Sequence, residues 1–400
     1  MNDPILTILS FLIIFTVVVV SHEFGHYLIA RMSGIRVNEF SIGMGPAIFR
    51  KKGKVTEFVI RLLPIGGACI FEGDEGNAAL DGSAFERGDG KEGSEGESSL
   101  KAADPEAGNA PAAGSDTDKG RKARYRAAAG EYRSFREAPV WSRIASVFAG
   151  PFFNVILAYL LALFIVWFCG ADLPVVHSVM DDYPAQAAGI EAGDEILSVD
   201  GLRTHLWREV MVRSYMNSGQ EMTIKYRRNG QEYTTKLVPK YDEEAERYFI
   251  GFSGGAEYVD CANLKVLKYS WFEVRYWLVA TVESLKYMVT GHASLDDLAG
   301  PVGVANIIDD TIEESKPMGA LMVVINMFNI AVLLSVNLGV LNLLPIPALD
   351  GGRLLFLLFE AVSGRKVPPE KEGFVHLIGF VLLMILMLVV LFNDIGRFFR

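Results

Sequence analysis

Four stretches of this chain are long and apolar enough to cross a lipid bilayer, and they constrain its fold more than any other feature. The hydrocarbon core of a bilayer is about 30 Å thick, and a helix needs about 20 residues to cross it. The stretches cover residues 4–32, 144–168, 318–344 and 374–392. No basic segment precedes the first stretch and no small-residue cleavage site follows it, so we expect a retained span rather than a signal peptide.

The remaining sequence predicts parts that lie in water. Half of the 400 residues are hydrophobic, which is typical of a few spans combined with a soluble domain. Residues 171–257 alternate polar and apolar side chains between turn residues, as a compact β-rich domain does. Residues 73–138 are rich in glycine, alanine, serine and acidic residues, and have too few large apolar side chains to fold. The net charge of −10 argues against a nucleic-acid partner.

These patterns predict a definite order of segments. They are transmembrane helix 1 at 1–32, a cytoplasmic or membrane-dipping β-hairpin region at 33–72, a low-complexity acidic linker at 73–138, transmembrane helix 2 at 139–169, the β-rich domain at 171–257, a juxtamembrane or interfacial helical region at 258–317, transmembrane helix 3 at 318–362, and transmembrane helix 4 with a tail at 363–400. Within the second segment, residues 55–72 predict two short strands around a turn at residues 64–67.

Basic residues near the span ends predict the orientation in the membrane, because cytoplasmic loops carry an excess of lysine and arginine. Such residues cluster between the first and second spans and between the third and fourth spans. Both loops should therefore be cytoplasmic, which places residues 170–316 and both termini outside. Arg397 and Arg400 in the last tail oppose this assignment, but they are fewer than the basic residues of the two loops.

The first span ends in the sequence SHEFGH, which predicts a metal site. His22 and His26 are four residues apart, so a helix places them on one face, where both can bind one metal ion. Glu23 lies beside them as a candidate general base for metal-bound water. The alternative is a polar cluster buried between helices that binds no metal.

A catalytic zinc site normally has three protein ligands, so a third must come from elsewhere in the chain. The four other histidines are better explained as surface or structural residues; they are His177, His205, His292 and His376. The three cysteines are far apart and support neither a disulfide framework nor a cysteine zinc site. Asp350 is the best candidate, because Pro345 and Pro347 disrupt the helix just before it and broken helices in membranes line protein or water-filled cavities. The alternative for Asp350 is a helix cap or a turn residue.

Several motifs in this sequence resemble those of one protein family. HEFGH in the first span and NLLPIPALDG in a later one resemble the site-2 proteases, which are intramembrane zinc metalloproteases, and the bacterial regulator-of-sigma-E protease branch in particular. The motifs FSIGMGP, LPIGGACIFEGDE, FAGPFFNVILA and LAGPVGVAN extend the resemblance over most of the chain. PAQAAGIEAGDEILSVDG, at residues 184–201, looks like part of a bacterial PDZ domain.

The resemblance implies roles for individual residues. His22, His26 and Asp350 would bind one Zn²⁺ per chain, and Glu23 would activate water. Asn342 and Asn337 match asparagines that contact substrate or shape the site. Gly150, Pro151 and Asn154 match a second-span motif that we assign to helix packing, since small residues let helices approach closely. Gly66 and Gly67 belong to a strand pair on which an extended substrate could lie, or which merely braces the first span.

The expected function is therefore intramembrane proteolysis at the bacterial cytoplasmic membrane. The family implies single-span membrane proteins as substrates, such as anti-sigma factors or leftover signal peptides, with peptide termini bound or filtered by the extracytoplasmic PDZ-like domain. Three features depart from the family pattern: Arg353 stands where many relatives have a histidine, only one PDZ pattern is visible where some members have two, and the acidic linker is an insertion. A metal transporter and a catalytically inactive scaffold are the competing functions.

Overall fold

The computed structural model describes residues 4–73, 132–217, 219–243, 247–255, 258–259, 261, 263–291 and 299–398. Most of the predicted linker at 73–138, and also His292, lie outside these residues. The chain divides into two compact units. The first contains residues 1–22, 150–344 and 382–400, and the second contains residues 23–149 and 345–381.

Four helices are long and apolar enough to cross a membrane, which confirms the predicted α-helical membrane fold. They are α1 (Pro4–Met32), α4 (Val140–Cys169), α9 (Ala320–Asn342) and α11 (Pro369–Phe398). Helix α11 leaves a long series of leucine, isoleucine and valine side chains exposed, as a helix in contact with lipid does. Helices α4 and α11 begin before the predicted stretches, because their first turns are polar enough to lie at the membrane surface.

The first unit contains the β-rich domain. Its central sheet has the order β6-β5-β7-β8 and encloses a core with Ile196, Ile224 and Met222 fully buried. The elements are β3 (Ala171–Asp172), β4 (Val176–Val179), α5 (Pro184–Ala187), β5 (Glu195–Val199), β6 (Leu202–Arg203), α6 (Trp207–Met216), β7 (Met222–Arg228), β8 (Gln231–Leu237), β9 (Lys240–Asp242), β10 (Arg247–Phe249), β11 (Phe252–Gly254) and β12 (Tyr258–Val259). The domain is therefore β-rich, as its alternating sequence predicts.

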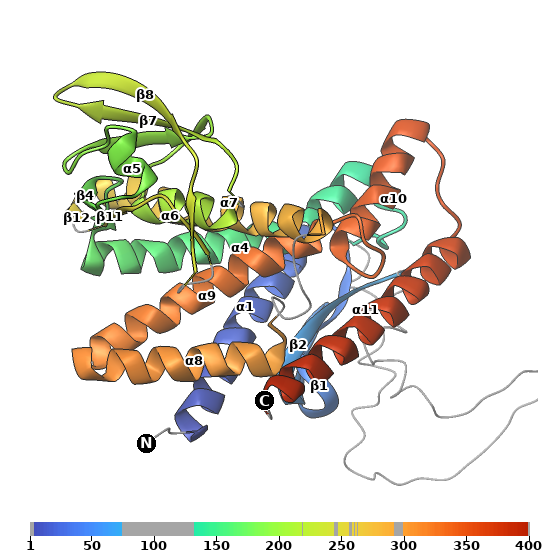
Figure 1. Ribbon diagram of the computed structural model, residues 1–400. Helices are drawn as coiled ribbons and strands as arrows, with labels where there is room; N and C mark the ends of the chain where they lie inside the picture. The colour runs from blue at the N-terminus through green and yellow to red at the C-terminus, as the bar shows by residue number, and fades with distance from the viewer. Residues whose placement is uncertain are drawn as a thin grey trace, which may run out of the picture. The chain divides into compact units, whose positions relative to one another are not determined.

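Three further helical elements of this unit follow the domain: α7 (Lys265–Val289), α8 (Pro301–Ser315) and the short η3 (Lys316–Met318). Helix α7 is fastened to α6 by ion pairs from Arg208 to Glu273 and from Arg275 to Glu209. Helix α8 packs beside α9 in Figure 1, and a buried core that includes Ile308 and Ile312 lies along it. The region predicted at 258–317 is thus mainly helical.

The second unit contains a sheet formed by β1 (Val37–Lys52) and β2 (Glu57–Phe71). Residues 39–42 pair with residues 67–70 on one side and with 57–60 on the other, while 47–52 pair with 57–61. The sheet is thus larger than the predicted pair of short strands within 55–72. That prediction missed β1, because Gly43, Gly45 and Pro46 interrupt the pattern of a strand.

Helix α10 (Asp350–Ser363) completes the second unit. The predicted third span at 318–362 therefore consists of two helices, since α9 ends at Asn342, and the LDG motif opens the second of them. Leu354 and Leu357 of α10 join a buried core with Phe71 and Phe135. Arg143 of α4 forms a bidentate ion pair with Glu360 of α10, and one of its two contacts measures 3.0 Å.

Candidate metal centre

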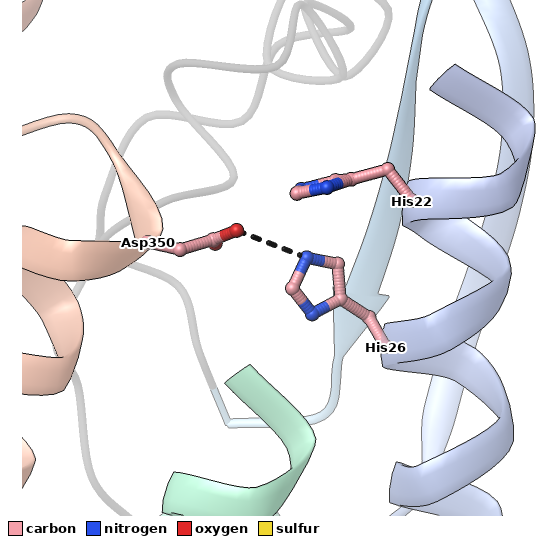
Figure 2. Close-up of side chains that lie close together, drawn as sticks. All are labelled: His22, His26 and Asp350. Carbon is pink, nitrogen blue, oxygen red and sulfur yellow. Dashed lines mark ion pairs between the residues drawn. The ribbon is translucent and has the colours of Figure 1, made fainter. Parts of the chain in front are cut away.

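Helix α1 carries both histidines of the HEFGH motif in one uninterrupted helix. Figure 2 shows that the side chains of His22 and His26 project from the same face of this helix. Each is 6% exposed, so both imidazoles are withdrawn from solvent. Burial in an apolar span is costly for a polar ring unless it has partners, and both rings have them.

His26 is held from two sides within the second unit. Its Nδ1 lies 2.9 Å from the carbonyl oxygen of Ser146 on α4, which can accept a hydrogen bond only from a protonated nitrogen. Its Nε2 lies 3.3 Å from Oδ2 of Asp350 (Figure 2). An imidazole that donates one N–H to a backbone carbonyl and turns the other nitrogen toward a carboxylate is oriented as metal-binding histidines usually are.

His22 is flanked by two asparagine side chains within the first unit. Nδ2 of Asn154 lies 3.3 Å from Nδ1 of His22, and Nδ2 of Asn342 lies 3.3 Å from Nε2. A neutral imidazole has only one acceptor nitrogen, so both amides cannot donate to it. Oδ1 of Asn154 is buried with no hydrogen-bond partner among the described residues, and rotating this amide by 180° would let Oδ1 accept the Nδ1–H of His22. His22 would then keep Nε2 for a metal or for Asn342.

The position of Asp350 follows from the break in the chain before it. Leu349 has an extended backbone, with φ −98° and ψ 163°, and Asp350 is the first residue of α10. The alternative of a helix-terminal residue therefore describes its backbone correctly. Its side chain, however, is directed at His26 (Figure 2), as a metal ligand would be.

The donor set fits a zinc ion. One ligand-type atom from each of His22, His26 and Asp350 lies within 4.8 Å of the others. Two atoms that are each about 2.0–2.2 Å from one tetrahedral Zn²⁺ are about 3.3–3.6 Å apart, and the 3.3 Å between His26 and Asp350 is in that range. Two imidazoles and a carboxylate are ligands that zinc accepts, and three protein ligands leave a position open for catalysis.

The other predicted site residues lie in different surroundings. Asn337 accepts a hydrogen bond of 2.5 Å from the hydroxyl of Thr281 on α7, so its amide is engaged in joining two helices. Gly66 and Gly67 lie in β2, and Gly66 has a φ of +85° that favours glycine. Arg353 lies over the rings of Phe71 and Phe135, with its guanidinium carbon 5.5 Å and 4.3 Å from their centroids.

The sequence named two further residues without predicting the contacts that they make. Asn154, which was assigned to helix packing, contacts His22, and no local pattern distinguishes such a contact from packing. His376, expected to be a surface or structural histidine, is only 2% exposed and accepts a hydrogen bond from the backbone N–H of Ala348. In the sequence, only the position of His376 at the polar start of an apolar span could have indicated that it is buried.

A family model for peptidase family M50 matches residues 10–386, which is nearly the whole chain. This chain belongs to peptidase family M50, the site-2 proteases. Its relatives include the zinc metalloprotease RasP of Shouchella clausii, which is 34% identical over 98% of this chain and 99% of its own. The regulator of sigma-W protease RasP of Bacillus subtilis is 33% identical over 98% and 99% of the two chains.

Membership of the M50 family confirms the resemblance found in the sequence. This M50 protein is a zinc metalloprotease, with Zn²⁺ as its cofactor, and a multi-pass membrane protein. The alternative of a metal transporter is therefore not supported. Among solved structures, the PDZ domain of an SdrC-like protein from Listeria monocytogenes matches 20% of this chain and 84% of its own, with 23% identity and a TM-score of 0.19.

Proposed function

We propose that this M50 protein hydrolyses peptide bonds in or near the transmembrane segments of single-span membrane proteins, with His22, His26 and Asp350 as its zinc ligands. One observation carries the proposal: the three side chains converge to within 4.8 Å, and two of them come from a helix apolar enough to cross a membrane. Substrates of the anti-sigma-factor or leftover signal-peptide type follow from the family and from a relative that is named a regulator of sigma-W protease.

Glu23 is the proposed general base. It follows His22 directly on α1 and is only partly exposed, so it is shielded from bulk solvent. Zn²⁺ held by these residues would supply a Lewis acid, and it would lower the pKa of a water molecule bound to it to about 7. Glu23 accepts the proton released on attack and passes it to the leaving amine, so that the peptide bond breaks into a carboxylate and an amine.

The asparagines beside His22 have proposed supporting roles. Asn154 accepts the Nδ1–H of His22 through Oδ1 and so fixes the tautomer in which Nε2 is free to bind zinc. Asn342, whose amide nitrogen is 3.3 Å from Nε2 of His22, would contact the substrate beside the zinc ligands. Asn337 also remains a predicted substrate contact.

The sheet of the second unit is the proposed binding surface for an unwound substrate. Residues 67–70 pair with residues 39–42 of β1 on one side and form one end of the order of paired segments in this sheet. The edge strand of a sheet can bind an extended peptide by adding it as a further strand. Met44, Ile48 and Leu62 are each about half exposed, which suits a sheet that dips into the membrane.

Proline substitutions along this edge test the binding surface. Backbone N–H groups of successive strand residues point to opposite edges of the strand. Of the two single variants Gly67→Pro and Ala68→Pro, one therefore removes an N–H that points away from β1. We expect that variant to cleave a transmembrane substrate at least about 10-fold more slowly, because one edge hydrogen bond and the fit of the edge are lost. Proline at Lys51, in the segment at the opposite edge, is the control. Normal cleavage by all three variants would exclude this edge as the binding surface.

The orientation and the role of the β-rich domain are part of the same proposal. The excess of basic residues between the first and second spans supports an orientation with the HEFGH end of α1 on the cytoplasmic side and the β-rich domain outside. There the domain, which we propose to be PDZ-like, would bind or exclude the outer ends of substrates. The membrane would be the bacterial cytoplasmic membrane.

Cleavage of a purified single-span substrate tests the proposed function. In detergent or liposomes, we expect the cut to fall within or next to the span, to stop on addition of a zinc chelator, and to resume when Zn²⁺ is restored. The reason is that two of the proposed ligands, His22 and His26, lie on α1, a helix apolar enough to cross a membrane. Cleavage restricted to soluble peptides, or cleavage that persists without metal, would contradict the proposal.

A further inference from the structure

A tight turn sets the position of Asp350 at the start of α10. The N–H of Leu349 lies 3.2 Å from the carbonyl oxygen of Ile346, which closes the turn. Pro347 occupies its second position and Ala348 its third, with a φ of +76°. Proline followed by a residue of positive φ defines a type II turn, in which glycine is strongly favoured at the third position.

Ala348 is therefore held in a conformation that an alanine avoids. Its N–H is not used by the turn and is instead 2.9 Å from Nδ1 of His376, a residue of α11. His376 is 2% exposed and its ring lies 5.8 Å from that of Phe356 on α10. A backbone N–H that is partly shielded from water needs an acceptor, so the histidine provides the hydrogen bond that this turn would otherwise lack.

Two glycines allow the turn to pack closely against both neighbouring helices. A Cβ atom added to Gly379 of α11 would lie 2.4 Å from the carbonyl oxygen of Pro347. A Cβ added to Gly352 of α10 would lie 2.5 Å from the carbonyl oxygen of Ile346. The turn is thus clamped between α10 and α11, and neither contact would tolerate even a methyl group without movement of the backbone.

We propose that His376 and Gly379 of α11 are positioning residues for the zinc ligand Asp350. They hold Ala348 at its positive φ. The type II turn then fixes where α10 begins and where the Asp350 carboxylate points. Metal sites require their ligands within about 0.5 Å of the productive geometry, so a turn only two residues from a ligand controls affinity. The inference rests on the proposed function, because it takes Asp350 as a zinc ligand.

Gly379→Ala is the sharpest test, with Gly396→Ala on the same helix as its matched control. An added Cβ at Gly396 meets nothing within 4 Å, whereas at Gly379 it displaces the turn. By competition with a chelator, we expect the Gly379 variant to bind zinc about 10- to 100-fold more weakly, as losses of outer support to metal ligands do. The control should keep the wild-type affinity. Equal affinities of the two variants would overturn the proposal.

A rescue experiment separates positioning from general stability. His376→Ala should also weaken zinc binding, and His376→Asn, whose side-chain oxygen can accept the Ala348 N–H, should retain most of it. Ala348→Gly removes the strain of the positive φ and should restore much of the affinity of His376→Ala. Failure of both the asparagine and the glycine to improve on alanine would contradict the positioning role.

Asp350→Asn, measured in parallel, distinguishes this inference from the proposed function. If Asp350→Asn binds zinc as tightly as the wild type, then the proposed ligand set is wrong. If it loses zinc while Gly379→Ala and His376→Ala both keep it, then the ligand set stands and only the positioning role fails.

Discussion

Replacing Glu23 by glutamine should remove nearly all peptide hydrolysis while leaving zinc in the protein. Glutamine has almost the same size and can still form hydrogen bonds, but it cannot accept the proton released when water attacks the peptide bond. General-base catalysis is worth about 10²- to 10⁴-fold, which corresponds to about 3–5 kcal/mol of transition-state stabilisation. Turnover of a single-span substrate and zinc content should be measured on the same preparation.

The control for this variant is Glu313→Gln, the same chemical change at a glutamate on α8 that pairs with Lys316. It should cleave at the wild-type rate and carry the same amount of zinc. Loss of zinc from Glu23→Gln would show that Glu23 is a ligand rather than a base. Retained turnover would show that another group accepts the proton.

Replacing Asp350 by asparagine should release the metal. The change preserves the shape of the side chain but removes the negative charge that favours binding of a divalent cation. Removing a residue that hydrogen-bonds to a metal ligand lowers metal affinity about 10- to 100-fold. Removing a ligand itself should therefore lower zinc affinity by more than about 10²-fold. Titration with a competing chelator measures the affinity directly, and cleavage should fall in parallel.

Asp394→Asn is the matched control for Asp350→Asn. Asp394 is a buried carboxylate, 4% exposed, on the membrane helix α11, and it accepts the N–H of Gly303 over 3.0 Å. Its replacement should leave zinc affinity unchanged. Loss of zinc from both variants to the same extent would mean that any buried charge in the spans affects binding, which the proposed ligand set does not allow.

The parts of this structure that depend on short-range patterns could be predicted from the sequence. Long apolar runs predict the four membrane helices, because a bilayer fixes both their length and their composition. The spacing of His22 and His26 predicts a shared helical face, because one helical turn separates them. Asp350 could be nominated from its carboxylate and the prolines before it, although it follows His26 by more than 300 residues.

The parts that depend on packing between distant segments could not be predicted in this way. The strand β1 was missed because glycine and proline break its pattern, and its pairing with two parts of β2 supplies what the local sequence lacks. The contact of Asn154 with His22 depends on how α4 turns toward α1, which no periodicity reveals. The role of His376 depends on the positive φ of Ala348, which is a property of the folded turn.

X-ray absorption at the zinc edge of the purified, membrane-extracted protein tests the proposed ligand set most directly. We predict a first shell of nitrogen and oxygen atoms at about 2.0–2.2 Å, with the outer-shell scattering of two imidazole rings. Asp350→Asn, loaded with zinc as far as its affinity allows, should show an altered oxygen contribution and the same two imidazoles. A sulfur atom at about 2.3 Å, or a shell with fewer than two imidazoles in the wild type, would contradict a zinc ion held by His22, His26 and Asp350.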